Sequence, residues 1–203
     1  PSAASEWYKR RALADGGKSL CRKFGNRIYR TQRPGEPWCR VDALDSYREV
    51  GRDMHLVTTN ESKVLVDCGA KPTTNRSEVQ PFFAAPEMLP LDNLDAVVIT
   101  HAHIDHIGML PVLFKYGYRG PVYCPPPPRD LMTLLQMDYI KVAKAEGNEP
   151  PYSKADIQEF IKHVVDINWG DKTDISPDIK MTMENAGHIL CSSSVYMQIG
   201  EGK

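Results

Sequence analysis

The chain lacks the run of about 20 apolar residues that a membrane-spanning helix needs, and no signal-peptide pattern opens it. It also lacks a Cys-x-x-Cys pair, because its five cysteines, at positions 21, 39, 68, 124 and 191, are scattered along the sequence. Free thiols in a reducing compartment are the simplest interpretation of an odd, dispersed set. We therefore expect a cytoplasmic protein with no membrane partner.

Net charge is nearly absent as well, at −1, but it is unevenly distributed. Residues 1–40 hold ten Lys and Arg against three Asp and Glu, a net charge of +7, which leaves −8 for residues 41–203. A basic segment of this kind is either a solvated tail or a surface that contacts phosphate groups. The sequence leaves both interpretations open.

Histidine and aspartate are concentrated in residues 98–108, which read VITHAHIDHIG. The four polar side chains of this stretch are His101, His103, Asp105 and His106. Imidazole and carboxylate together suit a divalent metal such as zinc, but four side chains so close in sequence cannot all serve one tetrahedral ion. On a turn after a strand the first two project to one side and the last two reach further along. The pattern therefore predicts two adjacent ions, as in enzymes that hydrolyse phosphoesters.

Neighbouring histidines also occur on solvated turns or in satisfied hydrogen bonds of a core. One histidine, or even a pair, would not decide between these explanations and metal binding. The complete His-x-His-x-Asp-His pattern directly after an apolar run favours metal binding.

This pattern resembles the signature of the metallo-β-lactamase superfamily. Residues 64–69, VLVDCG, are similar to the superfamily's first motif, and residues 185–188, NAGH, are similar to its third. Each would be weak evidence alone, but the order and separation of the three segments strengthen the resemblance. It implies that Asp67 supports the site by orienting a ligand or the attacking water.

The resemblance also implies two zinc ions per full-length chain and hydrolysis of a phosphodiester by water that they activate. The implied ligands are His101, His103 and His188 for one ion, and Asp105 and His106 for the other. Asp105 could also accept a proton, so Asp67 and Asp105 are the catalytic candidates. We interpret the chain as part of a longer protein, with a bridging aspartate expected beyond Lys203. The isolated chain should then be inactive, with a weak or empty second metal position.

Longer stretches narrow the resemblance. Residues 49–52, 114–118, 129–136 and 151–153 look like archaeal homologues of the cleavage and polyadenylation specificity factor nuclease, in the β-CASP group of RNA-processing nucleases. The resemblance implies an RNA endonuclease, with 5′-to-3′ exonuclease activity left open, and a homodimer of the full-length protein. Two alternatives stay open: another hydrolase on the same fold, such as a thioesterase or lactamase, and a non-catalytic scaffold subunit of an RNA-processing complex.

The chain departs from this resemblance close to its motifs. Asp45 and Ser46 stand where relatives usually carry Gly-Gly, Asp53 replaces a small residue, and Cys191 replaces a glycine. The first two departures lie near the expected substrate cleft. We expect them to affect substrate contacts and not metal binding.

Alternating strand and helix patterns predict an α/β protein. The resemblance specifies a partial metallo-β-lactamase αββα sandwich in residues 37–203, preceded in residues 1–36 by the end of a KH-like RNA-binding segment. Strands are expected at 41–44, 54–59, 63–67, 97–100, 121–124 and 194–199.

Helices are expected at 107–118, 129–146 and 153–162, the last opened by a capping box of Ser153 and Asp156. His163, at the end of that helix, is expected to be a charge partner of the helix terminus or a surface residue. The apolar residues expected to form the buried face of 129–146 are Leu131, Leu134, Leu135, Tyr139 and Val142.

Overall fold

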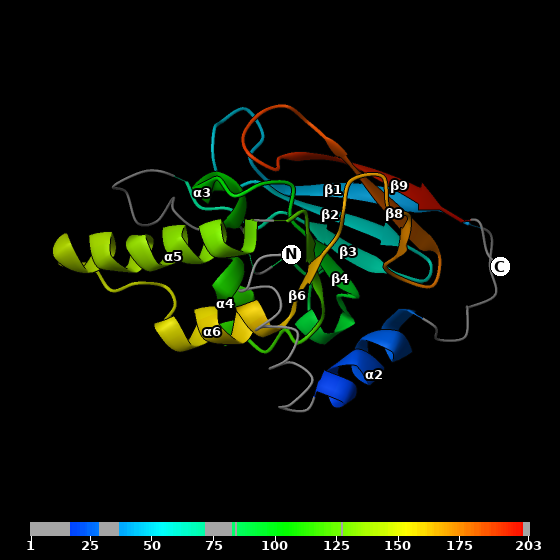
Figure 1. Cartoon of the computed structure of the whole chain (residues 1–203), viewed down its shortest axis with the longest axis horizontal. Helices are drawn as coiled ribbons and strands as arrows, with labels where there is room; N and C mark the ends of the chain where they lie inside the picture. The colour runs from blue at the N-terminus through cyan, green and yellow to red at the C-terminus, as the bar shows by residue number, and fades with distance from the viewer. Residues whose placement is uncertain (1–16, 29–36, 72–82, 84, 127, 201–203) are drawn as a thin grey trace.

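The computed structural model describes residues 17–28, 37–71, 83, 85–126 and 128–200. The strands within these ranges form two sheets (Figure 1). The larger sheet has the order β1 (Cys39–Asp45), β2 (Met54–Thr59), β3 (Lys63–Val66), β4 (Ala96–Val98), β5 (Val122–Cys124) and β6 (Val164–Asp166). Its first three strands pair antiparallel, and β3 to β6 pair parallel. The smaller sheet is antiparallel, with β8 (Ile179–Asn185) between β7 (Thr173–Asp174) and β9 (Ser193–Ile199).

The central strands β3, β4 and β5 are buried on both faces of the larger sheet, which explains their near-continuous apolar runs. In β3, Val64 joins a cluster between the two sheets, whereas Leu65 joins the main core under the helices. This alternation follows from the period of two in a strand. The smaller sheet contributes Ile179, Met181 and Met183 to the cluster between the sheets.

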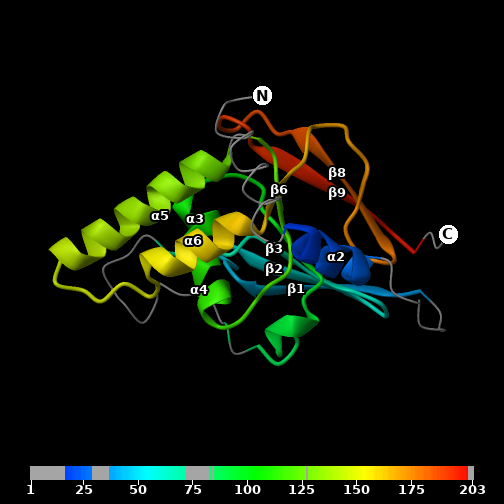
Figure 2. The ribbon, with the colours of Figure 1, turned by 60° about the horizontal axis from the view of Figure 1, so that its bottom comes forward.

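Helices cover the other face of the larger sheet. They are α3 (Ile104–Ile107), α4 (Leu110–Lys115), α5 (Pro128–Ala145) and α6 (Lys154–Lys162). Figures 1 and 2 show α4, α5 and α6 gathered together, away from β8 and β9. The described layers are therefore helices, large sheet and small sheet, which agrees with the predicted α/β class and partial sandwich. No helix in the described ranges is long and apolar enough to cross a bilayer.

The single helix predicted for 107–118 is wrong. The structure has two short helices, because the backbone N–H of Met109 donates to the carbonyl of Cys68 at 2.9 Å instead of continuing the helix. Pro111 lies in the first turn of α4, where its missing N–H costs nothing. Residues 110–114 are all buried, so α4 is a core helix and not an amphipathic one.

The predicted buried face of α5 is also partly wrong. Leu134 is 65% exposed and Val142 is 47% exposed. The fully buried row instead contains Met132 and Gln136, and the Gln136 amide donates to the carbonyl of Ile107 at 3.1 Å. The spacing of apolar residues predicted the wrong face of α5, because the polar residue Gln136 lies at the centre of the buried face. The other three predicted residues pack against the core and are partly buried.

The capping box of α6 is confirmed, since Ser153 and Asp156 bond reciprocally at its first turn. The prediction for His163 is wrong. Its side chain is only 4% exposed, and Nδ1 donates to the carbonyl of Gly120 at 3.0 Å. Burial lowers the pKa of His163, so the ring is a neutral core group and not a charge at a helix end.

The basic N-terminal segment is described only in part. Residues 1–16 and 29–36, which include the predicted domain boundary, lie outside the described residues. Within α2 (Gly17–Ile28), the guanidinium of Arg27 donates to the carbonyls of Leu94 and Asp92. Arg22 and Lys23 are exposed. Arg27 of α2 therefore contacts the α/β domain, whereas Arg22 and Lys23 face solvent.

Candidate metal centre

The first two sequence motifs meet at the carboxyl ends of β3 and β4, which are parallel neighbours. The N–H of Cys68 donates to the carbonyl of His106 at 2.7 Å, and that of Ala70 donates to the carbonyl of Ile104 at 2.9 Å. The two loops are thus joined by their backbones, independently of the side chains that each presents. Gly69 makes the approach possible, because a Cβ there would lie 1.5 Å from the carbonyl oxygen of Asp105.

The third motif arrives from the smaller sheet, in the loop between β8 and β9. The N–H of Ser193 donates to the carbonyl of Thr100 at 2.9 Å, which ties this loop to the end of β4. The buried hydroxyl of Ser192 accepts from the N–H of His188 at 3.0 Å. Cys191 has φ of +60°, a left-handed conformation that favours glycine, which explains why a glycine suits this position.

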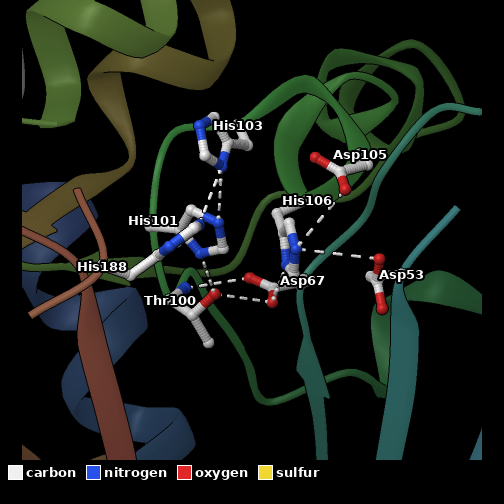
Figure 3. A network of polar contacts seen from close by, with 8 residues as sticks. All are labelled: Asp53, Asp67, Thr100, His101, His103, Asp105, His106 and His188. Atoms are coloured by element: carbon white, nitrogen blue, oxygen red, sulfur yellow. Dashed lines mark hydrogen bonds and ion pairs between the residues drawn. The ribbon is translucent and has the colours of Figure 1, made fainter. Parts of the chain in front are cut away.

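Three histidines converge where these loops meet (Figure 3). The Nδ1 atom of His103 lies 3.1 Å from Nε2 of His101 and 3.3 Å from Nε2 of His188. One nitrogen faces two others, and a single proton cannot satisfy all three. A cation between them can, and three imidazoles are a donor set that zinc accepts with one position left open. The residues present therefore fit a metal ion.

The tautomer of His101 follows from its neighbours. The hydroxyl of Thr100 donates its proton to Oδ2 of Asp67 at 2.8 Å, so the hydroxyl oxygen of Thr100 accepts from Nδ1 of His101 at 2.9 Å. This leaves the lone pair of Nε2 directed at the other two histidines. Burial, followed by the charge of His106, lowers the pKa of His101 to about 4, which keeps the ring neutral and able to bind a metal.

A second group of possible ligands lies beside the first, formed by Asp53, Asp105 and His106, with their ligand atoms all within 4.8 Å of one another. The Nε2 atom of His106 is 3.7 Å from Asp53 and 3.8 Å from Asp105. The rings of His101 and His106 have centroids 4.0 Å apart, so the two groups are adjacent.

Asp53 was not among the site residues predicted from the sequence. The only signal was its departure from the small residue usual at that place, and we expected that departure to affect substrate contacts instead of metal binding. The structure places the carboxylate of Asp53 next to that of Asp105, in a group that could hold a metal ion, since the start of β2 runs alongside the second motif.

Asp67 lies behind these groups and is 4% exposed. Its Oδ1 accepts from the N–H of Thr100 at 2.9 Å, and its Oδ2 accepts from Nδ1 of His106 at 2.8 Å. Both oxygens are therefore engaged by the protein, which favours the orienting role among those inferred for Asp67. Burial lowers the pKa of His106, but the hydrogen bond to Asp67 and the charges of Asp67, Asp53 and Asp105 outweigh it and raise that pKa. The environment of Nε2 therefore attracts positive charge.

The loop that carries Asp53 is braced by charged side chains. The carboxylate of Glu49 accepts from the guanidinium of Arg52 and, at 2.8 Å, from the ammonium of Lys71. These bonds lower the pKa of Glu49, with the Lys71 bond contributing most. Ser46 has φ of +75°, so the second position of the Gly-Gly pair usual in relatives has a glycine-like backbone here.

The sequence profile of the metallo-beta-lactamase superfamily matches residues 47–200. Two similar curated proteins are both named transcription termination factor FttA. The protein from Methanocaldococcus jannaschii is 50% identical over 186 residues, and that from Methanosarcina mazei is 46% identical over 185. Each alignment covers 91% of this chain and 29% of the relative, so the chain spans less than a third of their length.

A solved metallo-beta-lactamase fold protein, YhfI from Bacillus subtilis, has a TM-score of 0.49 and 18% identity, over 82% of this chain and 60% of that one. That likeness is too low to add to the assignment. The profile match spans all three motifs, and the archaeal relatives agree with the narrower resemblance. The chain belongs to the metallo-beta-lactamase superfamily.

Proposed function

We propose that this chain forms the metal-binding part of a ribonuclease that hydrolyses RNA phosphodiester bonds in RNA 3′-end processing or transcription termination. The observation that carries the proposal is the adjacency of a three-histidine group and a carboxylate-rich group, with the rings of His101 and His106 only 4.0 Å apart. Two neighbouring cation positions are the arrangement that phosphoester hydrolysis uses. Zinc as the metal, two ions per full-length chain, a homodimer and a cytoplasmic location belong to the same proposal, whereas 5′-to-3′ exonuclease activity is left open.

The residues have distinct roles in this proposal. His101, His103 and His188 hold one cation through the nitrogens that converge on His103. Asp105 and His106 supply part of the ligand set of the second cation. When bound, two divalent cations lower the pKa of water between them and offset the negative charge that develops on the phosphoryl oxygens.

Asp67 and Asp105 are the two catalytic candidates, with different roles. Asp67 fixes the ring of His106 directly and that of His101 through the hydroxyl of Thr100, so in each neutral ring the proton lies on Nδ1 and the lone pair of Nε2 faces the metal position. Asp105 is partly exposed, and its carboxylate has a second possible role as acceptor of the proton that the attacking water loses.

The relatives support an RNA substrate over the alternatives. They are named transcription termination factor, which favours RNA over the substrates of a thioesterase or lactamase. Every motif residue expected in this part of the chain is present, which speaks against a scaffold that has lost its metal ligands. The chain spans under a third of the length of those relatives, so an RNA-binding cleft in the whole protein belongs to the proposal.

His103→Ala in the full-length protein that contains this chain tests the proposal. His103 is exposed, so its truncation should leave the fold intact while removing the nitrogen on which the other two histidines converge. We expect loss of zinc on metal analysis and at least a hundredfold slower cleavage of a labelled RNA. The matched control is His55→Ala in β2, a histidine of neither group. A wild-type cleavage rate in His103→Ala would refute the proposal.

A further inference from the structure

Asp53 is held rigidly against the second motif. Its backbone N–H donates to the carbonyl of Asp105 at 2.9 Å, and its carbonyl accepts from the N–H of Gly69 at 3.0 Å. The separation between the backbones that carry the carboxylates of Asp53 and Asp105 is therefore set by hydrogen bonds on both sides of Asp53. Such preorganisation is what a metal site requires of residues from different segments.

The distances around His106 suit a shared ion better than direct hydrogen bonds. Its Nε2 lies 3.7 Å from Asp53 Oδ2 and 3.8 Å from Asp105 Oδ2. Both exceed the 3.2 Å or so of an ordinary N–H···O bond. Two ligand atoms on one tetrahedral zinc ion, each about 2.1 Å from it, lie roughly 3.4 Å apart. The observed separations are close to that value.

The negative charges of the two carboxylates in this group are also not balanced without a cation. Among the described residues, His106 is the only polar contact of the carboxylates of Asp53 and Asp105. Both are about three-quarters buried, with side-chain exposures of 24% and 25%. Two carboxylates confined side by side repel each other, and a divalent ion would neutralise the pair.

We propose that Asp53 is the third protein ligand of the second ion, which makes that position richer in oxygen than the three-histidine position. Carboxylate oxygens suit harder cations such as Mn²⁺, whereas imidazoles suit zinc. The inference rests on the proposed function, because it concerns the second cation of the same centre. It revises the expectation that this chain supplies only Asp105 and His106 to that ion.

Metal titration of the chelator-stripped 203-residue chain tests the inference without any activity assay. We expect the wild-type chain to bind two zinc ions tightly. Asp53→Ser should bind one zinc ion tightly and the second with an affinity at least tenfold lower. With the first position filled by zinc, electron paramagnetic resonance should show protein-bound Mn²⁺ in the wild type and much less in Asp53→Ser. Asp138→Ser on the exposed face of α5 removes the same charge and should change neither result.

A second variant separates direct ligation from a through-space charge effect. Asp53→Cys should shift the preference of the second position from Mn²⁺ to Cd²⁺ and produce the near-ultraviolet absorption of a cadmium–thiolate bond, because thiolates select soft metals. A purely electrostatic role of Asp53 would give no such band.

The outcomes distinguish this inference from the proposed function. Two tightly held ions in Asp53→Ser would overturn the role of Asp53 and leave the nuclease proposal standing. If the wild-type chain bound a single ion, and His103→Ala lost it, the role of Asp53 would again be overturned and the nuclease proposal would again stand. If neither His103→Ala nor Asp53→Ser changed metal binding, both the inference and the proposed metal centre would fail.

Discussion

The Oδ2 atom of Asp67 lies 2.8 Å from Nδ1 of His106, although the two residues belong to different motifs. Because a carboxylate accepts, the proton of the neutral ring lies on Nδ1, and the lone pair of Nε2 faces the second candidate cation position. The same oxygen accepts from the hydroxyl of Thr100, which in turn fixes His101. One buried carboxylate thus sets the tautomer of a histidine in each ligand group.

Asp67→Asn should reverse that arrangement at His106. The Asn oxygen must still accept from the N–H of Thr100, so its amide would point at Nδ1 of His106 and force the proton onto Nε2. We expect metal affinity at the second position to fall roughly 10- to 100-fold. Metal titration measures the loss, and nitrogen chemical shifts of the ring report the tautomer. Asp95→Asn, a buried aspartate before β4, is the control. An unchanged tautomer would contradict the prediction.

Gly69→Ala should weaken both the fold and the second metal position. The added Cβ would meet the carbonyl carbon and oxygen of Asp105, backbone atoms that cannot rotate away. Overpacking of this kind costs about 1–3 kcal/mol of unfolding free energy. Denaturant unfolding and metal titration measure the two effects. Gly25→Ala in α2, where nothing lies within 4 Å, should instead be neutral or stabilising. Equal stability of the two variants would show that the loops move apart freely.

His163 should make stability depend on pH. Burial lowers its pKa in the folded chain below the usual 6.5, despite the nearby carboxylate of Glu159. Below about pH 6.5 the unfolded chain takes up a proton that the folded chain does not, so stability falls with pH until the folded pKa is reached. The loss is about 1.4 kcal/mol for each unit between the two pKa values.

His163→Asn keeps a donor for the carbonyl of Gly120 but cannot titrate. Its stability should be lower overall, through weaker packing on Phe114, and should change less between pH 7 and pH 5. Urea unfolding at a series of pH values compares the two slopes. The same slope in both proteins would assign the pH dependence to other groups.

The basic N-terminal segment should contribute non-specific RNA affinity. Replacing Arg22 and Lys23 by Gln, together with the three basic residues of 9–11, should flatten the dependence of binding on salt. The log–log slope should change by about 0.7 for each RNA phosphate that the variant no longer neutralises. Arg27 is left out because its guanidinium donates to backbone carbonyls.

Binding of a single-stranded RNA oligonucleotide at several salt concentrations gives this slope. A control variant with Lys141→Gln and Lys144→Gln, two exposed lysines of α5, removes charge elsewhere. If the slope is the same in both variants and the wild type, the segment serves packing or solubility.

The sequence by itself predicted what depends on neighbours along the chain. Spacing alone grouped His101 with His103 and separated Asp105 and His106 from them, because four ligand-type side chains within six positions allow few geometries. The resemblance to a family added His188. The first five strands of the larger sheet and the capping box at Ser153 were likewise predictable, since alternation and capping are local, whereas β6 (Val164–Asp166) was not predicted.

Tertiary structure alone decided the rest. Asp53 precedes Asp105 by more than fifty residues, and only the pairing of β2 with β3, beside β4, brings the two carboxylates together. His163 and Gln136 are polar by sequence but buried, because Gly120 and Ile107 offer them backbone carbonyls. A local sequence pattern gives the polarity of a side chain but not whether that side chain is buried. Whether it meets a partner depends on which distant backbone packs against it, and that pairing exists only in the folded chain.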